Sequence, residues 1–154
     1  MFICVIVIGV FTYKSNTLTF GIPQLLVIMF GGILYVILHE VTHGLVIKIT
    51  SGFEVQYGLA SFAAYAGNKN AFFDKKSYIF IALAPVVIFG LIFLLASIIL
   101  PFSWFWVCVI LQALNISGAV GDIYVTYITL KMPKDLLVND LGISMIFYSA
   151  IEKD

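Results

Sequence analysis

Long apolar runs separated by short polar segments make up most of this chain, and the runs predict its helices. Three of them reach the roughly 20 residues that cross the hydrocarbon core of a bilayer as a helix. They lie at about Ile22 to Ile47, Tyr78 to Leu100 and Ser103 to Leu130. A shorter apolar run, Met1 to Tyr13, predicts a short N-terminal helix. We therefore expect an all-α membrane protein, a polytopic helical bundle that forms one integral membrane domain over residues 1–154.

The polar segment after the first long run predicts a small β-like loop at the membrane surface. From Thr50 to Lys76 the chain turns polar and aromatic. Within it, apolar side chains alternate with polar or small ones from Phe53 to Leu59, the period of a half-buried strand. A weaker alternation of the same kind runs from Ile143 to Phe147 near the C-terminus. The aromatic side chains of the loop suit either an interfacial belt or a strand edge on which an unwound peptide substrate pairs.

Composition supports the membrane assignment and excludes some partners. Hydrophobic residues make up 62% of the 154-residue chain and charged residues only 10%, whereas soluble domains are about 45–50% apolar. Eight basic residues, all of them lysine, balance eight acidic ones, and no basic stripe is available for nucleic acid. Cys4 and Cys108 lie in different apolar runs without CxxC spacing, so we expect no disulfide and no thiolate metal site.

The distribution of lysine predicts the orientation in the membrane. One face of the predicted bundle carries nearly all of these residues: Lys48, Lys69, Lys75, Lys76, Lys131 and Lys134. The opposite face carries only Lys14. By the positive-inside rule, the lysine-rich face is cytoplasmic. The first and third long helices are then parallel, and both run toward the cytoplasm.

Both histidines of the chain lie in the motif His39-Glu40-Val41-Thr42-His43, inside the first long apolar run. Residues four apart project from the same face of a helix, so His39 and His43 can hold one metal ion. Glu40 lies about 100° around the helix from His39, where it can act on water without binding the metal. Polar groups of this kind are costly in hydrocarbon, and metal binding would satisfy them. The motif predicts a zinc site with Glu40 as the catalytic base.

A third zinc ligand is required, and Asp122 is the other acidic residue inside the long apolar runs. Counted from the cytoplasmic ends of their helices, the motif and Asp122 both lie about 10–16 Å deep, so the two clusters can meet. Asn115 and Asp122 share a helix face, and we expect the Asn115 amide to bind a substrate carbonyl or oxyanion. An ion pair without metal for Asp122, and a plain interhelical hydrogen bond for Asn115, are the structural alternatives.

These residues predict an intramembrane zinc protease that acts on membrane-embedded or membrane-proximal peptide bonds, with the lipid bilayer and a membrane protein or peptide as its partners. Two other functions use the same polar groups. A catalytically silent membrane scaffold would keep the metal without hydrolysis. A small transporter would use the histidines and the aspartate as an ion or proton relay, although few spans and no second ionisable path are available for one.

Several segments together resemble the DUF3267 family of zincin peptidases, which is similar to the site-2 protease superfamily. They are HEVTHG from His39, YIFIALAP from Tyr78 to Pro85, NISGAVGD from Asn115 to Asp122, and Asp140-Leu141-Gly142 with Phe147-Tyr148. The resemblance implies His39, His43 and Asp122 as Zn²⁺ ligands and Glu40 as general base. We expect an integral protein of a prokaryotic plasma membrane, with its site toward the cytoplasmic side that the lysines indicate. Site-2 proteases carry Asn-x-x-Pro-x-x-x-x-Asp-Gly, whereas here the aspartate follows the asparagine by seven residues and Ile123 comes next.

Overall fold

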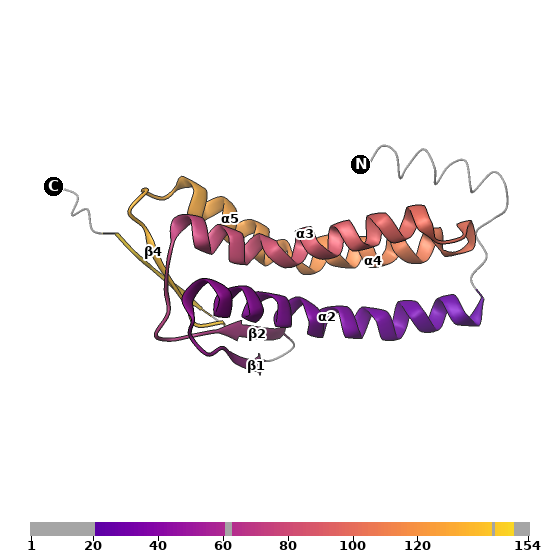
Figure 1. Cartoon of the computed structure of the whole chain (residues 1–154), viewed down its shortest axis with the longest axis horizontal. Coiled ribbons are helices and arrows are strands. Elements are labelled where there is room, and N and C mark those ends of the chain that lie inside the picture. The colour runs from indigo at the N-terminus through magenta and orange to yellow at the C-terminus, as the bar shows by residue number, and fades with distance from the viewer. Residues whose placement is uncertain (1–20, 61–62, 143, 150–154) are drawn as a thin grey trace.

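The computed structural model describes residues 21–60, 63–142 and 144–149 as an elongated helical bundle with two small sheets at one end (Figure 1). The predicted N-terminal helix, Met1 to Tyr13, lies outside these residues. Its helices, in chain order, are α2 (Ile22–Ser51), α3 (Lys75–Ile99), the short 3₁₀ helix η1 (Phe102–Trp104), α4 (Phe105–Gly118) and α5 (Val120–Lys131). The described part of the chain is therefore mostly helical, as predicted.

Two of the described helices, α2 and α3, are long and apolar enough to cross a membrane. Helices α4 and α5 make a third span if they are counted together, with a bend of 46° between them. The sequence predicted one helix from Ser103 to Leu130, so the break is a correction. It follows the pair Ser117 and Gly118, and Gly121 stands just beyond it; glycine and serine pairs are among the common causes of helix kinks.

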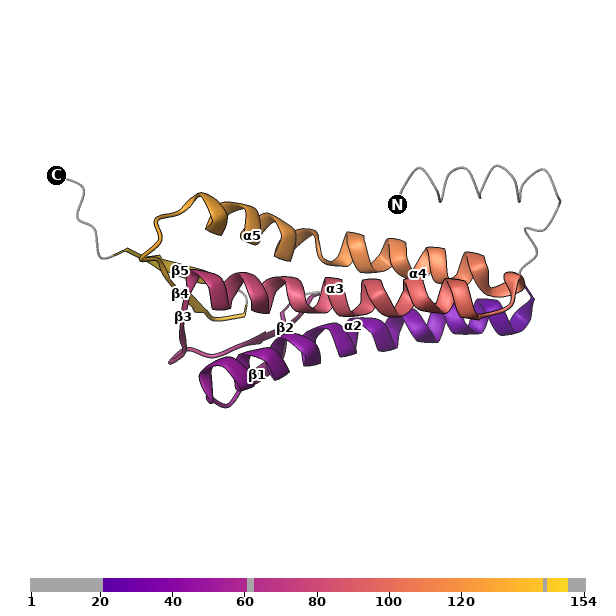
Figure 2. The same ribbon diagram turned by 45° about the horizontal axis from the view of Figure 1, so that its top comes forward.

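The direction of the helices agrees with the prediction. Helices α2, α4 and α5 run the same way along the bundle, and α3 runs in the opposite direction (Figures 1 and 2). The predicted parallel arrangement of the motif helix and the last span is thus confirmed. Lys48, Lys75 and Lys131 lie at the ends of α2, α3 and α5 beside the sheets. The lysine-rich loops therefore gather at that end.

Five short strands cover this end of the bundle. A hairpin pairs β1 (Gln56–Ala60) with β2 (Ala63–Gly67), and an antiparallel sheet of order β3-β4-β5 joins β3 (Phe72–Asp74), β4 (Leu137–Asp140) and β5 (Met145–Tyr148). The two alternating segments of the sequence overlap β1 and β5, although β1 begins three residues later than the predicted strand. In β2, β3 and β4 the polarity of the side chains does not alternate, and these strands were not predicted from the sequence.

The two sheets meet at a close backbone contact. A Cβ atom added to Gly67 would lie 2.5 Å from the Gly142 nitrogen, so only glycine fits there. Gly142 itself adopts a positive φ of 86°, which favours glycine. The Asn139 side chain donates hydrogen bonds to the carbonyls of Lys69 and Ala71, at 3.1 and 2.8 Å. We call the five joined strands the sheet layer.

Burial is concentrated at the end that carries the sheet layer. All buried residues of α2 lie from Tyr35 onward, and all those of α3 lie at or before Pro85. We call these parts of α2 and α3, with α5 and the sheet layer, the sheet half; Ile22–Leu34, Val86–Ile99 and α4 form the outer half. The main apolar core lies in the sheet half: Val46, Ile47, Ala71, Phe73, Tyr78, Ile81, Ala84, Leu136 and Val138. The outer half exposes large apolar side chains, which suits lipid as its surroundings.

Candidate metal centre

Three side chains from two helices converge inside the sheet half. The Nε2 atom of His39 lies 3.1 Å from one carboxylate oxygen of Asp122, and the Nε2 atom of His43 lies 3.4 Å from the other. One ligand atom from each of the three residues lies within 4.8 Å of the others. Both imidazoles are buried and the Asp122 side chain is 25% exposed. The structure therefore brings together the three residues that the sequence proposed as zinc ligands.

The local structure explains this convergence. His39 and His43 are one helical turn apart on α2, so their rings project from the same face. Asp122 lies in the first turn of α5, immediately after the bend. The N-terminal end of a helix carries partial positive charge and favours a carboxylate. The break between α4 and α5 thus gives Asp122 a favourable position opposite the two rings.

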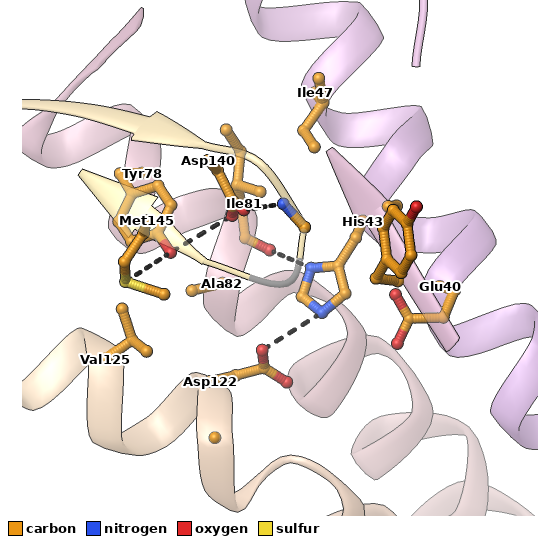
Figure 3. Close-up of a pocket in the computed structure, with 14 residues that line it drawn as sticks. Glu40, His43, Ile47, Tyr78, Ile81, Ala82, Asp122, Val125, Asp140 and Met145 are labelled. Carbon is orange, nitrogen blue, oxygen red and sulfur yellow. Dashed lines mark hydrogen bonds and ion pairs between the residues drawn. The ribbon is translucent and has the colours of Figure 1, made fainter. Parts of the chain in front are cut away.

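Hydrogen bonds on the far side of each ring identify the nitrogen that faces Asp122. The Nδ1 atom of His43 lies 3.0 Å from the Ile81 carbonyl oxygen. A carbonyl can only accept, so His43 donates through Nδ1–H and Nε2 is left toward Asp122 (Figure 3). The Nδ1 atom of His39 lies 2.8 Å from the Tyr35 hydroxyl oxygen. Both rings therefore present Nε2 to the same carboxylate.

The donor set fits zinc. The lone pairs of two Nε2 atoms and a carboxylate repel one another when they face the same space. Either a metal ion bound between them or protons on the imidazoles would remove this repulsion. Zinc held tetrahedrally at about 2.0–2.1 Å places neighbouring ligand atoms about 3.3 Å apart. His39 and His43 lie 3.1 and 3.4 Å from different oxygens of Asp122, and one ligand atom from each of the three residues lies within 4.8 Å of the others, close enough for one ion to be shared after small side-chain shifts. Three protein ligands would leave the fourth position for water or substrate, the arrangement of catalytic zinc sites.

A cavity of about 220 Å³ opens beside these residues. His43 and Asp122 line it, and so does Glu40, whose carboxylate faces it from α2 (Figure 3). In the part of the chain that the structure describes, no hydrogen bond holds the Glu40 carboxylate. The remaining walls come from α2, α3, α5 and the sheet layer: Ile47, Tyr65, Ala66, Tyr78, Ile81, Ala82, Gly121, Val125, Asp140, Gly142 and Met145.

Asn115 lies elsewhere, and this corrects the prediction that it contacts substrate. Its side chain is fully buried and does not line the cavity. The amide nitrogen donates to the Val86 carbonyl at 3.0 Å, and the amide oxygen accepts from the Tyr35 hydroxyl at 3.0 Å. Asn115 and Asp122 both face α2, as their predicted shared face requires, but the Asn115 amide is already bound by Tyr35 and Val86. Asn115 thus makes the interhelical hydrogen bonds of the structural alternative.

Sequence reasoning missed two residues of the site. Tyr35 contacts His39 through its hydroxyl, and its signal was a tyrosine one helical turn before a ligand inside an apolar run. Asp140 was noted in a segment that resembles the family, but without a role. It lines the cavity and accepts hydrogen bonds from the Tyr78 hydroxyl at 3.3 Å and the Gly142 nitrogen at 2.8 Å. Burial raises the pKa of Asp140 above the ordinary value of an aspartate.

Comparison with known proteins agrees with this site. Residues 32–137 match the family model DUF3267, which is described as "Putative zincin peptidase". The chain belongs to this family. The matched residues include both histidines and Asp122, and zincin peptidases use zinc, so zinc is the cofactor that the family implies.

One curated relative adds a similarity of sequence without a function. An uncharacterized 24.7 kDa protein in the gap 5' region of Pyrococcus woesei is 36% identical to this chain over 118 residues. The alignment covers 73% of this chain and 50% of that protein, so the chain spans about half the length of the relative. No solved structure matches the chain.

Proposed function

We propose that this protein is an intramembrane zinc metallopeptidase, similar to site-2 proteases, that hydrolyses peptide bonds of membrane-embedded or membrane-proximal substrates. One observation carries the proposal. His39, His43 and Asp122 converge at the edge of a cavity that Glu40 also lines, in a helical bundle whose long helices suit a membrane. Membership of the zincin peptidase family supports the same activity.

The proposed reaction divides the work between the metal and the chain. Zinc held by His39, His43 and Asp122 would polarise the peptide carbonyl and lower the pKa of water toward about 7. Glu40 takes a proton from the water as its oxygen attacks the carbonyl carbon. The same proton then passes to the leaving nitrogen, the C–N bond breaks, and a carboxylic acid and an amine are released. The apolar part of the cavity wall, which includes Ile47, Ile81 and Val125, would contact the substrate side chains.

The lysine-rich end supports a cytoplasmic position for the site in a prokaryotic plasma membrane. Lys48, Lys75 and Lys131 mark this end on three helices, and the positive-inside rule assigns it to the cytoplasm. His43 precedes the end of α2 by eight residues, or about 12 Å along a helix. A substrate would therefore reach the ligands from the cytoplasmic third of the bilayer, beneath the sheet layer.

The strand-edge hypothesis for substrate binding acquires a more specific form. Tyr65 and Ala66 of β2 line the cavity, whereas no residue of β1 does. A peptide that pairs with a strand next to the metal centre would therefore pair with β2, and not with the segment Phe53 to Leu59 that the sequence suggested. Its pairing as an extended chain would expose the peptide bond that a helical substrate hides.

Glu40→Gln tests the proposed function. Removing the base should lower hydrolysis of a quenched-fluorescent peptide mixture in proteoliposomes about 10²–10⁴-fold, while zinc stays bound at the wild-type stoichiometry. Glu54→Gln is the matched control, because the Glu54 side chain is 95% exposed and does not line the cavity. Full hydrolysis by the Glu40→Gln protein would refute the role of Glu40. Zinc binding without hydrolysis by the wild type would favour the metal-binding scaffold.

A further inference from the structure

Pro85 leaves a carbonyl of α3 without its usual partner. In an α-helix, the carbonyl of each residue accepts a hydrogen bond from the N–H group four residues later. The residue four after Ile81 is Pro85, which lies inside α3 and has no N–H. The Ile81 carbonyl is instead 3.0 Å from the Nδ1 atom of His43. The proline therefore opens an acceptor in the wall of the metal centre, directly behind one of the two imidazoles.

A second chain of hydrogen bonds ends at His39, and its direction is fixed by another carbonyl of α3. The Val86 carbonyl can only accept, so the Asn115 amide nitrogen donates to it and the amide oxygen faces Tyr35. This oxygen also can only accept, so the Tyr35 hydroxyl donates its proton to Asn115. The hydroxyl oxygen is then free to accept from Nδ1–H of His39, 2.8 Å away.

We propose that Pro85 and Tyr35 are positioning residues of the metal centre: through the Ile81 carbonyl and through Asn115, they hold both imidazoles with Nδ1 protonated and Nε2 toward Asp122. The inference deepens the proposed function, because it concerns the zinc ligands of that same site. Neither residue touches the metal or the substrate. Partners behind metal-binding histidines fix the tautomer and the ring orientation, and their loss typically costs 10–100-fold in metal affinity.

Substitutions of Tyr35 and of Pro85 should weaken zinc binding to different extents. Tyr35→Phe removes the hydroxyl that accepts from His39 and leaves the buried Nδ1–H without this partner. Pro85→Ala removes nothing from the site. It adds an amide N–H that competes with His43 for the Ile81 carbonyl, and a carbonyl has two lone pairs. The expected effect of Pro85→Ala is therefore smaller than that of Tyr35→Phe.

Zinc affinity, measured by competition with a chromogenic chelator, gives the first test. Tyr35→Phe should weaken zinc binding by about 10–100-fold and Pro85→Ala by about tenfold. Tyr124→Phe and Pro101→Ala are the matched controls, because Tyr124 is 62% exposed and Pro101 lies beyond the far end of α3. Adding Asn115→Ala to Tyr35→Phe should cause little further loss, since both act on His39 through one chain of hydrogen bonds. Affinities within twofold of wild type in Tyr35→Phe and Pro85→Ala would overturn the proposal.

Nitrogen-15 NMR of the zinc-loaded protein gives a second test that needs no substrate, and its first part needs only the wild type. In the wild type, both rings should bind through Nε2 and carry a slowly exchanging proton on Nδ1. The His43 proton should exchange faster in Pro85→Ala, and the His39 proton faster in Tyr35→Phe. Metal binding through Nδ1 of either wild-type ring would overturn the proposal even if a variant failed to fold. Because neither readout uses hydrolysis, a protein that binds zinc but cleaves no peptide would refute the proposed function alone.

Discussion

The sheet half and the outer half are built from the same three spans but differ in what holds them together. In the sheet half, helices pack against one another and against five strands, and the buried histidines lie among apolar core residues. In the outer half, α2 and α3 contribute no buried residue from Ile22–Leu34 or Val86–Ile99, and large apolar side chains point outward. Lipid can solvate such side chains but cannot satisfy a buried polar group.

The difference shows which part of a bundle with helices apolar enough to span a membrane can hold buried polar side chains. Imidazoles and carboxylates need fixed partners, and fixed partners need tight packing on all sides. The sheet half supplies such packing with strands as well as helices. In the outer half, the buried residues come from α4, which packs inward through Val107, Cys108, Leu111 and Asn115. Function and cooperative stability should therefore both depend on the sheet half.

The largest expected effect is loss of the metal. His39→Ala, His43→Ala and Asp122→Ala each remove one of three protein ligands, and each should reduce zinc binding by more than about 100-fold, because a two-ligand site is poorly occupied. Metal analysis of the purified proteins measures this effect, with Glu54→Ala as the control. Any of the three that retains full zinc occupancy is not a ligand.

Truncation of matched leucines tests the comparison between the halves directly. Leu136 is 2% exposed in the core of the sheet half, and Leu95 is 54% exposed in the outer half. Leu136→Ala should cost about 2–5 kcal/mol of unfolding free energy, and Leu95→Ala no more than about 0.5 kcal/mol. Thermal unfolding in detergent, followed by the fluorescence of Trp104 and Trp106, provides the measurement. Equal losses would mean that the two halves are packed alike.

A smaller effect is expected at the junction of the two sheets. Gly67→Ala puts a methyl group against the backbone of Gly142 and should destabilise the protein by about 1–3 kcal/mol. Gly31→Ala is the control from the outer half, where a Cβ atom would meet its neighbours at 3.8 Å or more. That change should be neutral or stabilising, because alanine favours a helix over glycine. A stable Gly67→Ala protein would show that the two sheets can separate without cost.

The smallest effect is expected at the exposed edge of the sheet half. Asp74 caps α3 by accepting a hydrogen bond from the Ser77 nitrogen at 2.7 Å, and this bond lowers the pKa of Asp74. Asp74→Ala should cost about 1 kcal/mol near pH 7. Since the folded pKa is the lower one, the contribution is complete above the unfolded pKa of about 3.9 and disappears as the pH falls through the folded value. Unfolding midpoints across this range, with Asp74→Asn as a control that keeps a cap, measure it.

Much of this architecture follows from the sequence because hydrocarbon imposes simple rules. Apolar runs of sufficient length predicted α2 and α3, and lysine placement predicted the parallel course of α2 and the last span. The meeting of His39 and His43 with Asp122 was foreseen because costly polar groups at equal depth have few ways to be satisfied. What a helical period could not reveal was the bend at Ala119, which depends on packing as well as on Gly118.

The errors have physical causes too. Asn115 was assigned to the substrate because an amide near a metal motif is a common oxyanion donor, but its partners are a tyrosine and a backbone carbonyl. Backbone acceptors carry no signature in the sequence except where a proline removes their usual donor, as Pro85 does for Ile81. Short strands such as β3 and β4 are fixed by pairing between distant segments, and a local alternation of polarity does not show it.

Two connections tie α2 to the last span, and they lie seven residues apart: Asn115 reaches Tyr35, and Asp122 reaches the histidines. A slip of one helix along the other by a single turn, about 5.4 Å, would break both at once. Zinc binding therefore requires the correct alignment of α2 with the last span. A bundle assembled in the wrong register would not hold zinc at this site.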